Sequence, residues 1–148
     1  MCDTPGMTES LQSEIAQLCD EFSLVALYVF GSRAAEVAAR VAGLPAPCEH
    51  PHSDVDVGAL PRRGYALSAR DKVQLTQRLE SALAVPRVDL VVLPESEVFL
   101  AADVVRGELL AATDLDAEVE AQLYYLRRAA DLAPFLREQW RDAVGSEL

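Results

Sequence analysis

Two aspartates separated by one residue, Asp54 and Asp56, are the feature of the sequence most suggestive of chemistry. They begin DVDVGAL (54–60), where acidic and apolar residues alternate as in a strand with one face toward a cleft. On a strand, both carboxylates leave the same face, with Cα atoms about 6.6 Å apart. Two ionised carboxylates about 5 Å apart repel by roughly 3 kcal/mol, and a shared divalent cation removes that cost. Because no His or Cys lies on this strand, Mg²⁺ or Mn²⁺ is favoured over Zn²⁺.

Asp89 is the third candidate, a single carboxylate within the apolar segment Val88–Leu93. This segment predicts a buried strand, in which an unpaired charge would be costly. If it lies beside the strand of Asp54 and Asp56, three carboxylates can hold two metal ions, as in phosphoryl or nucleotidyl transfer. The structural alternative is an ion pair between Asp89 and Arg87 or another residue at the edge of the core.

A Gly-Ser turn supplies a candidate phosphate site. Gly31-Ser32 follows the apolar segment Leu24–Phe30, a predicted strand, and precedes a predicted helix over 33–41. Glycine lets the backbone approach a ligand closely, and the first amides of the next helix point at an anion. Ser32 is also the predicted N-cap of that helix.

Each of these signals is weak alone, but their order along the chain is specific. YVFGSRA (28–34), SDVDVGAL (53–60) and RVDLVVL (87–93) resemble the three signature segments of the DNA polymerase β-type nucleotidyltransferase superfamily. The small size points to its minimal nucleotidyltransferases, the MNT proteins. The resemblance covers residues 24–93, and VRGELL (105–110) resembles the stretch that follows the third aspartate in MNT antitoxins.

The resemblance implies a catalytic set and a phosphate-binding set. The catalytic and metal-binding residues are Asp54, Asp56 and Asp89, of which Asp89 also helps to activate an acceptor hydroxyl. The nucleotide-binding residues are Gly31, Ser32 and Arg33.

The implied activity is magnesium-dependent transfer of AMP from ATP to a tyrosine hydroxyl on a partner HEPN ribonuclease toxin, with this chain as antitoxin. A non-catalytic antitoxin that covers its partner's site is the alternative. Nucleotidyl transfer to a small molecule such as an aminoglycoside is less favoured, because the 55 residues after Leu93 leave little room for a substrate domain.

The length of 148 residues predicts one domain of α/β (α+β) class, with a small mixed sheet flanked by helices. We expect a core over about 8–112 and a helical C-terminal segment over about 113–148. The proline-rich segment 43–53 reads as a loop insertion, because it makes the gap between Ser32 and Asp54 longer than is usual in the resembling family.

Four further predictions concern helices. The first amphipathic helix runs through Leu11, Ile15, Leu18 and Phe22, after a polar leader. A second helix follows the capping box Ser68 and Asp71, with Val73, Leu75, Leu79 and Leu83 on its apolar face. The remaining expectations are a helix capped by Ser96 and stopped by Gly107, and a last helix capped by Asp116, with Val119, Leu123 and Leu126 on its apolar face, that kinks or restarts at Pro134.

Composition excludes several function classes. The formal net charge of −11 disfavours stable binding to DNA or RNA and favours a basic partner surface. The sequence has neither a signal-peptide pattern nor an apolar run long enough for a membrane span. Three widely spaced cysteines give no disulfide framework, so we expect a cytoplasmic protein.

Three secondary features keep structural and functional readings open. Cys48, His50 and His52 form a C-x-H-x-H pattern, which we interpret as an exposed loop rather than a zinc site. Tyr124 and Tyr125 favour packing over modification, and the apolar face of the last helix fits either a homodimer or a partner complex. Arg62-Arg63, just past the DxD strand, is more typical of a solvated face than of a triphosphate site.

Overall fold

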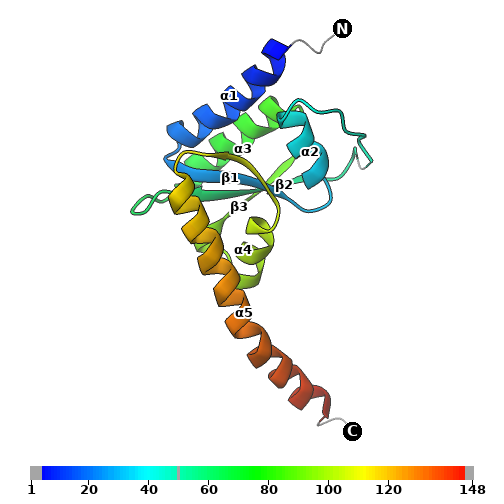
Figure 1. Cartoon of the computed structure of the whole chain (residues 1–148), viewed down its shortest axis with the longest axis vertical. Helices are drawn as coiled ribbons and strands as arrows, with labels where there is room; N and C mark the ends of the chain where they lie inside the picture. The colour runs from blue at the N-terminus through cyan, green and yellow to red at the C-terminus, as the bar shows by residue number, and fades with distance from the viewer. Residues whose placement is uncertain (1–4, 50, 146–148) are drawn as a thin grey trace.

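The computed structural model describes residues 5–49 and 51–145, and in them a four-stranded mixed sheet lies between two groups of helices (Figure 1). This confirms the predicted fold class. The elements are α1 (Pro5–Glu21), β1 (Leu24–Phe30), α2 (Ala34–Val41), β2 (Val55–Pro61), α3 (Ala69–Leu83), β3 (Val88–Val92), the 3₁₀ turn η1 (Leu93–Glu95), α4 (Val98–Val105), β4 (Glu108–Ala112) and α5 (Leu115–Gly145).

The strand order is β3-β2-β1-β4. β1 pairs antiparallel with both β2 and β4, whereas β2 and β3 pair in parallel. In this register Asp56 lies opposite Phe30 on one side and opposite Asp89 on the other. The sheet therefore brings the segments around residues 30, 56 and 89 together at one end.

Helices α1, α2 and α3 cover one face of the sheet, and α4 and the first half of α5 cover the other (Figure 1). β1 is buried along nearly its whole length because it is a central strand with helices on both faces, which explains why its sequence is almost entirely apolar. Leu75, Leu79 and Leu83 of α3 are buried as predicted, but Val73 is 56% exposed. The apolar stripe of α3 is narrower than its sequence suggests.

Several predicted helix ends are wrong by one or two residues. Ser32 does not cap α2, whose N-cap position is Arg33, without a side-chain cap. Ser96 bonds back to the Leu93 carbonyl, and Glu97 caps α4 instead. The cap of α5 comes from Asp114, which accepts from the Ala117 amide, rather than from Asp116. The capping box of Ser68 and Asp71 is confirmed.

Gly107 follows the end of α4 as predicted, but for a different reason. A Cβ at this position would lie 2.4 Å from the Val29 carbonyl oxygen. The glycine is therefore required by the close approach of the chain to β1, because any side chain would collide with the backbone of the central strand.

The two ends of the chain also differ from expectation. The predicted polar leader is partly helical, because α1 begins at Pro5. Cys19 on α1 is fully buried, and burial together with the neighbouring Asp20 carboxylate raises the pKa of its thiol to about 12. Helix α5 continues through Pro134, so it does not restart there, and its far half extends away from the sheet (Figure 1).

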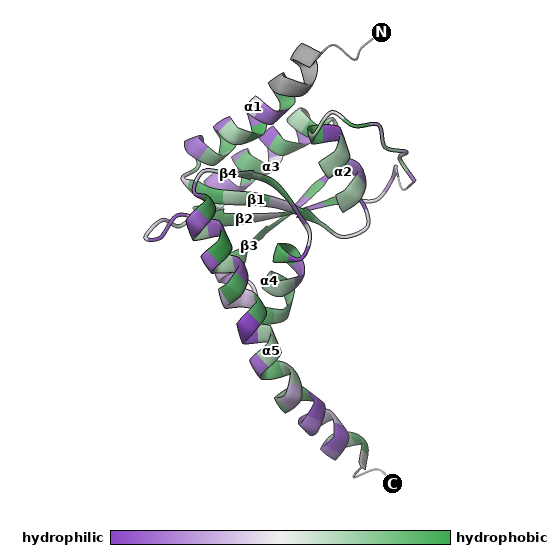
Figure 2. Ribbon diagram, viewed as in Figure 1, coloured by the Kyte–Doolittle hydropathy of each residue, from purple (hydrophilic) through white to green (hydrophobic). Residues whose placement is uncertain are grey.

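Along α5 the surface is mixed, with apolar and hydrophilic residues alternating to its end (Figure 2). Val119 and Leu123, predicted on its apolar face, are half exposed, while Tyr125 and Leu126 pack against the core. None of the helices in the described residues is long and apolar enough to cross a membrane. The large exposed apolar side chains of α5 are Leu115, Val119, Leu123, Tyr124, Phe135, Leu136, Trp140 and Val144.

Candidate functional site

The three predicted aspartates lie at one end of the sheet and form what we call the aspartate cluster. Asp54 immediately precedes β2, Asp56 is its second residue, and Asp89 is the second residue of β3, in register with Asp56. Paired residues on neighbouring strands share a face, so Asp56 and Asp89 are on the same side of the sheet. It is the α4 side, because a Cβ on Gly58, two residues after Asp56, would collide with Val104 of α4.

The charge of the aspartate cluster is poorly compensated. Burial raises the pKa of Asp56, and the carboxylates of Asp89 and Asp54 raise it further. In the described residues the ion pair of the cluster is with Arg87, whose Nε lies 3.7 Å from Asp54 Oδ2. Both of these side chains are well exposed, so the pair contributes little. Asp54 and Arg87 form this ion pair, rather than the Asp89–Arg87 pair of the structural alternative.

The chemistry of the donor set fits a hard divalent cation, since three carboxylates from adjacent strand ends repel one another when ionised. Their side chains are not gathered around a single point, however. Within residues 5–49 and 51–145, no three His, Cys, Asp or Glu side chains are close enough together to hold an ion in their present rotamers.

Gly31 lies directly against this cluster. Its φ of 81° is in the left-handed region, and a Cβ there would lie 2.5 Å from Asp56 Oδ2. Only glycine satisfies both conditions, so the turn after β1 is fitted to the Asp56 carboxylate. Ser32 follows with an exposed side chain, between this turn and the start of α2. The predicted catalytic and phosphate-binding segments are thus in contact.

Arg33 points elsewhere. Its guanidinium is 4% exposed and donates two hydrogen bonds to the Glu36 carboxylate, at 3.1 and 2.8 Å. It also donates to the Ser53 carbonyl at 3.1 Å and contacts Cys48 Sγ at 3.6 Å. Arg33 therefore fastens the loop before β2 to α2, and this geometry gives it a structural position rather than a phosphate contact.

Glu36 is shared between two arginines. Arg40 donates to the same carboxylate at 2.7 Å and to the Leu83 carbonyl at 2.7 Å, linking α2 to the end of α3. The hydrogen bonds from Arg33 hold the pKa of Glu36 below its ordinary value, and the charges of Arg33 and Arg40 add to this effect. We refer to Arg33, Glu36 and Arg40 as the arginine–glutamate cluster. Sequence analysis did not identify it, although the i, i+3 and i, i+4 spacings were available.

The C-x-H-x-H pattern lies in the predicted loop. Cys48 and His52 are exposed, and His50 is outside the described residues. The Cys48 sulfur faces Arg33, which is a cation and therefore an unfavourable neighbour for a metal ion. The described part of the loop supports the structural interpretation.

A second buried carboxylate joins α5 to the sheet. Glu118 is 3% exposed and accepts a hydrogen bond from the Tyr28 hydroxyl at 2.9 Å and another from Gln122 Nε2 at 2.6 Å. Burial and this bond raise the pKa of Tyr28. Sequence reasoning missed the pair because its members are 90 residues apart, and no local pattern marks Glu118 among the acidic residues that begin α5.

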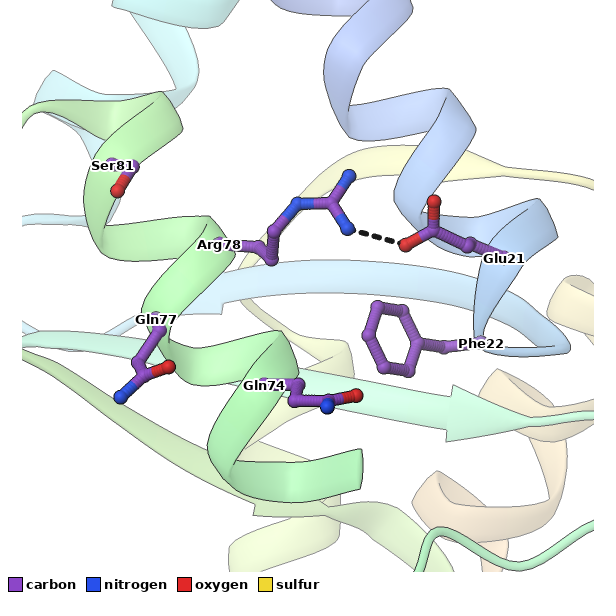
Figure 3. Close-up of a pocket in the computed structure, with 6 residues that line it drawn as sticks. All are labelled: Glu21, Phe22, Gln74, Gln77, Arg78 and Ser81. Atoms are coloured by element: carbon purple, nitrogen blue, oxygen red, sulfur yellow. Dashed lines mark hydrogen bonds and ion pairs between the residues drawn. The ribbon is translucent and has the colours of Figure 1, made fainter. Parts of the chain in front are cut away.

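A pocket of about 410 Å³ lies between α1 and α3, on the other face of the sheet (Figure 3). Arg78 and Glu21 form an ion pair across it at 2.5 Å, and the Phe22 ring closes one side. None of the aspartates lines it. Both charged side chains are about half exposed, so this pocket is a polar surface feature unconnected with the aspartate cluster.

Structural comparison gives a consistent set of similar proteins, although no family model and no curated protein sequence matches the chain. A crystal structure of a toxin–antitoxin with AMP-PNP aligns with a TM-score of 0.62 and 24% identity, covering 92% of this chain and 96% of that one. A mutant of the toxin–antitoxin pair MntA–HpeT gives 0.62 and 23%, with the same coverage.

The third comparison is a tri-AMPylated Shewanella oneidensis HEPN toxin in complex with MNT antitoxin. Its matching chain aligns with a TM-score of 0.58 and 24% identity over 95% of this chain and 97% of its own length. The chain therefore has the fold found in toxin–antitoxin structures of the MNT type, as the sequence resemblance implies. At these identities the likeness concerns the fold, and the activity is argued below from the residues.

Proposed function

We propose that this chain is a magnesium-dependent nucleotidyltransferase that moves AMP from ATP onto a hydroxyl of a HEPN-domain partner, a tyrosine by the sequence resemblance, and thereby acts as its antitoxin. The observation that carries the proposal is the aspartate cluster. Three carboxylates at the adjacent ends of two paired strands lie beside a glycine turn whose φ and close contact with Asp56 disfavour any other residue. That combination has no structural purpose of its own, because it concentrates like charges at an accessible sheet end.

Asp54, Asp56 and Asp89 are the proposed metal ligands. Bound Mg²⁺ would neutralise the charge of the triphosphate and of the carboxylates. Gly31 and Ser32 are the proposed phosphate-binding residues, because their backbone lies against Asp56 and leads into the first turn of α2. Arg33 is assigned a positioning role, since its bond to the Ser53 carbonyl fixes the residue before Asp54.

In the proposed reaction, the acceptor oxygen attacks the α-phosphorus of ATP and the bond from that phosphorus to the bridging oxygen breaks. Pyrophosphate leaves, and the hydroxyl proton passes to the Asp89 carboxylate and then to solvent. Asp89 is exposed and is on the edge strand of the sheet, so a macromolecular acceptor can reach it.

The MNT neighbours support the nucleotide and the partner. One such structure was solved with AMP-PNP, and another contains a HEPN toxin that carries AMP groups. The net charge of −11 also favours a basic partner and works against a nucleic acid as acceptor.

The direct test is intact-mass analysis of a purified HEPN-domain partner after incubation with this chain, ATP and Mg²⁺. We expect mass increases of whole AMP units with the wild type, and none when Mg²⁺ is replaced by a chelator. A partner that keeps its mass under conditions where ATP binds to this chain would disprove the transfer.

A binding-only antitoxin is the second candidate, and the exposed apolar side chains of α5 favour it. Phe135, Leu136 and Trp140 are 46% to 71% exposed and belong to the far half of α5, which extends away from the sheet (Figure 1). Under this reading the partner's ribonuclease would be blocked by complex formation without any mass increase, and substitution of the aspartates would leave the block intact. The same mass experiment therefore separates the two functions.

A further inference from the structure

The edge strand β3 has hydrogen-bonding capacity on its outer side. It pairs with β2 only, and the Val55 amide donates to the Arg87 carbonyl at 3.0 Å. In a parallel pair of strands, the N–H and C=O groups of successive residues point to opposite sides of the strand. Those of Asp89 therefore point toward β2, and those of Val88 and Leu90 point to the outer side. The Val88 amide donates a hydrogen bond to Glu80 Oε2 of α3 at 3.0 Å. The backbone N–H and C=O of Leu90 remain at the open edge.

A groove runs along this edge. Its volume is about 440 Å³, and β3 and the side of α3 form its walls. Val73 in this wall is 56% exposed, an apolar side chain where the sequence predicts a core residue. We call this feature the β3 groove. Its lining residues are Lys72, Val73, Thr76, Gln77, Val88, Asp89 and Leu90.

We infer that an extended segment of the acceptor protein adds to the edge of β3 and that this pairing delivers the hydroxyl to Asp89. The inference rests on the proposed function and names how its acceptor binds. Main-chain hydrogen bonds to Leu90 hold the added strand, and side chains pointing alternately up and down meet two different surfaces. One side chain enters the β3 groove beside Val73, and the next lies on the face of Asp89 and Asp56.

The distances expected in a sheet suit this arrangement. Residues directly opposite on paired strands have Cβ atoms about 4.5–5.5 Å apart. A hydroxyl-bearing residue opposite Asp89 is therefore within reach of its carboxylate without any change in the sheet. The pairing also fixes which residue of the acceptor is presented, because a slip of one residue would turn the hydroxyl to the groove side.

Charge selects the occupant. A second copy of this chain carries the same net charge of −11, and edge pairing would bring the exposed Asp89 of each copy close to the other. An acceptor segment with lysine or arginine beside its hydroxyl residue is instead attracted by the net negative charge of this chain. The expected occupant is therefore a cationic, extended segment of the partner protein.

The test uses two variants of α3 that introduce the same charge. Val73→Lys places an ammonium group in the β3 groove, whereas Gln74→Lys places one on the neighbouring pocket between α1 and α3. Both positions are exposed, so both variants are expected to fold. The readouts are the KM for a purified HEPN-domain partner in AMP transfer and the Kd of AMP-PNP by calorimetry. Hydrogen exchange of the Leu90 amide with and without the partner is the third.

We expect Val73→Lys, which repels a cationic segment, to raise the KM for the partner by about tenfold, equivalent to about 1.4 kcal/mol, and to leave the Kd of AMP-PNP within about twofold. Gln74→Lys should change neither value. Equal KM values for the two variants would overturn edge pairing and leave the proposed function standing.

If the wild type transfers no AMP, the proposed function fails. Hydrogen exchange then tests, independently of AMP transfer, whether the partner pairs with the edge of β3. Slower exchange of the Leu90 amide on addition of the partner would then support the pairing. Unchanged exchange would overturn it.

Discussion

Two charged clusters lie side by side near one end of the sheet and differ in how their charge is balanced. In the arginine–glutamate cluster, one buried carboxylate receives hydrogen bonds from two guanidinium groups. In the aspartate cluster, three carboxylates share one weak, exposed ion pair within the part of the chain that the structure describes. The pKa of Glu36 is accordingly lowered, whereas that of Asp56 is raised.

The difference separates a structural cluster from a ligand-binding one. A paired network around a buried carboxylate keeps the backbone in place, because removing a member leaves a charge with fewer partners or with none. In an accessible cluster of like charges, the carboxylates repel one another and are kept close only by the fold. A bound cation relieves this repulsion. The hydrogen bond from Arg33 to the Ser53 carbonyl connects the two clusters, one residue before Asp54.

The largest expected effect comes from removing charge in the aspartate cluster. Asp54→Asn with Asp56→Asn should lower AMP transfer by at least about a thousandfold, or about 4 kcal/mol of transition-state stabilisation. Thermal stability should stay the same or rise, because like-charge repulsion is relieved. Transfer rates by intact mass and a melting curve measure both. Asp103→Asn on α4, an exposed aspartate, is the matched control.

A fall in stability of the double variant comparable to that of a core substitution would contradict the comparison. It would mean that these carboxylates, like Glu36, are part of a balanced structural network.

The opposite pattern is expected in the arginine–glutamate cluster. Arg33→Met should lower the free energy of unfolding by about 3 kcal/mol, since buried Glu36 is then left with Arg40, which is 38% exposed. Urea unfolding measures this change. Arg33→Met with Glu36→Leu should recover most of the stability, because replacing a whole buried pair by apolar residues is often nearly neutral. A loss no larger than that of exposed Arg70→Met would refute the structural role.

Gly31 tests the contact between the glycine turn and the aspartate cluster. Gly31→Ala combines an unfavourable φ with a Cβ that would lie 2.5 Å from Asp56 Oδ2, whereas Gly64→Ala has a similar φ of 86° and open space around it. Both should lose about 1 kcal/mol of stability from the backbone. We expect only Gly31→Ala to reduce AMP transfer further, by about tenfold. Equal transfer by both variants would show that the turn does not set the position of Asp56.

The smallest effect is the pH dependence contributed by Glu36. Its pKa in the folded protein lies below the ordinary value of 4.5, so the ionised form stabilises the fold. That contribution is fully present above the unfolded pKa and is lost as the pH falls through the folded pKa. The difference in unfolding free energy between wild type and Glu36→Gln should therefore be constant near neutral pH and shrink below about pH 4.5. A difference that grows on acidification would contradict the assignment.

Where hydrophobic patterning decides structure, the sequence was a reliable guide. The apolar segment 24–30 became β1 with the same bounds, since a central strand with helices on both faces must be apolar throughout. The mixed sheet and the convergence of Gly31, Asp56 and Asp89 at one end were likewise predictable. The aspartate roles stay predictions, since geometry alone does not test a reaction.

Two kinds of feature escaped prediction. Helix caps were misplaced where two polar residues compete, as with Asp114 and Asp116, because the choice depends on how the chain leaves the preceding strand. Buried polar partners were missed where they are distant in sequence, as with Tyr28 and Glu118. The burial of Arg33 depends on Ser53, 20 residues away, so its motif position alone could not show that its guanidinium faces inward.

The reactivity of the Cys19 thiol can report how often α1 separates from the sheet. A cysteine that is fully buried, with a pKa of about 12, reacts with an alkylating reagent only when the helix opens. Cys48 is exposed, so it should react at once and serves as the internal reference for the reagent. The rate at which Cys19 follows, measured in a Cys2→Ser background, would report how often α1 leaves the sheet in the folded protein.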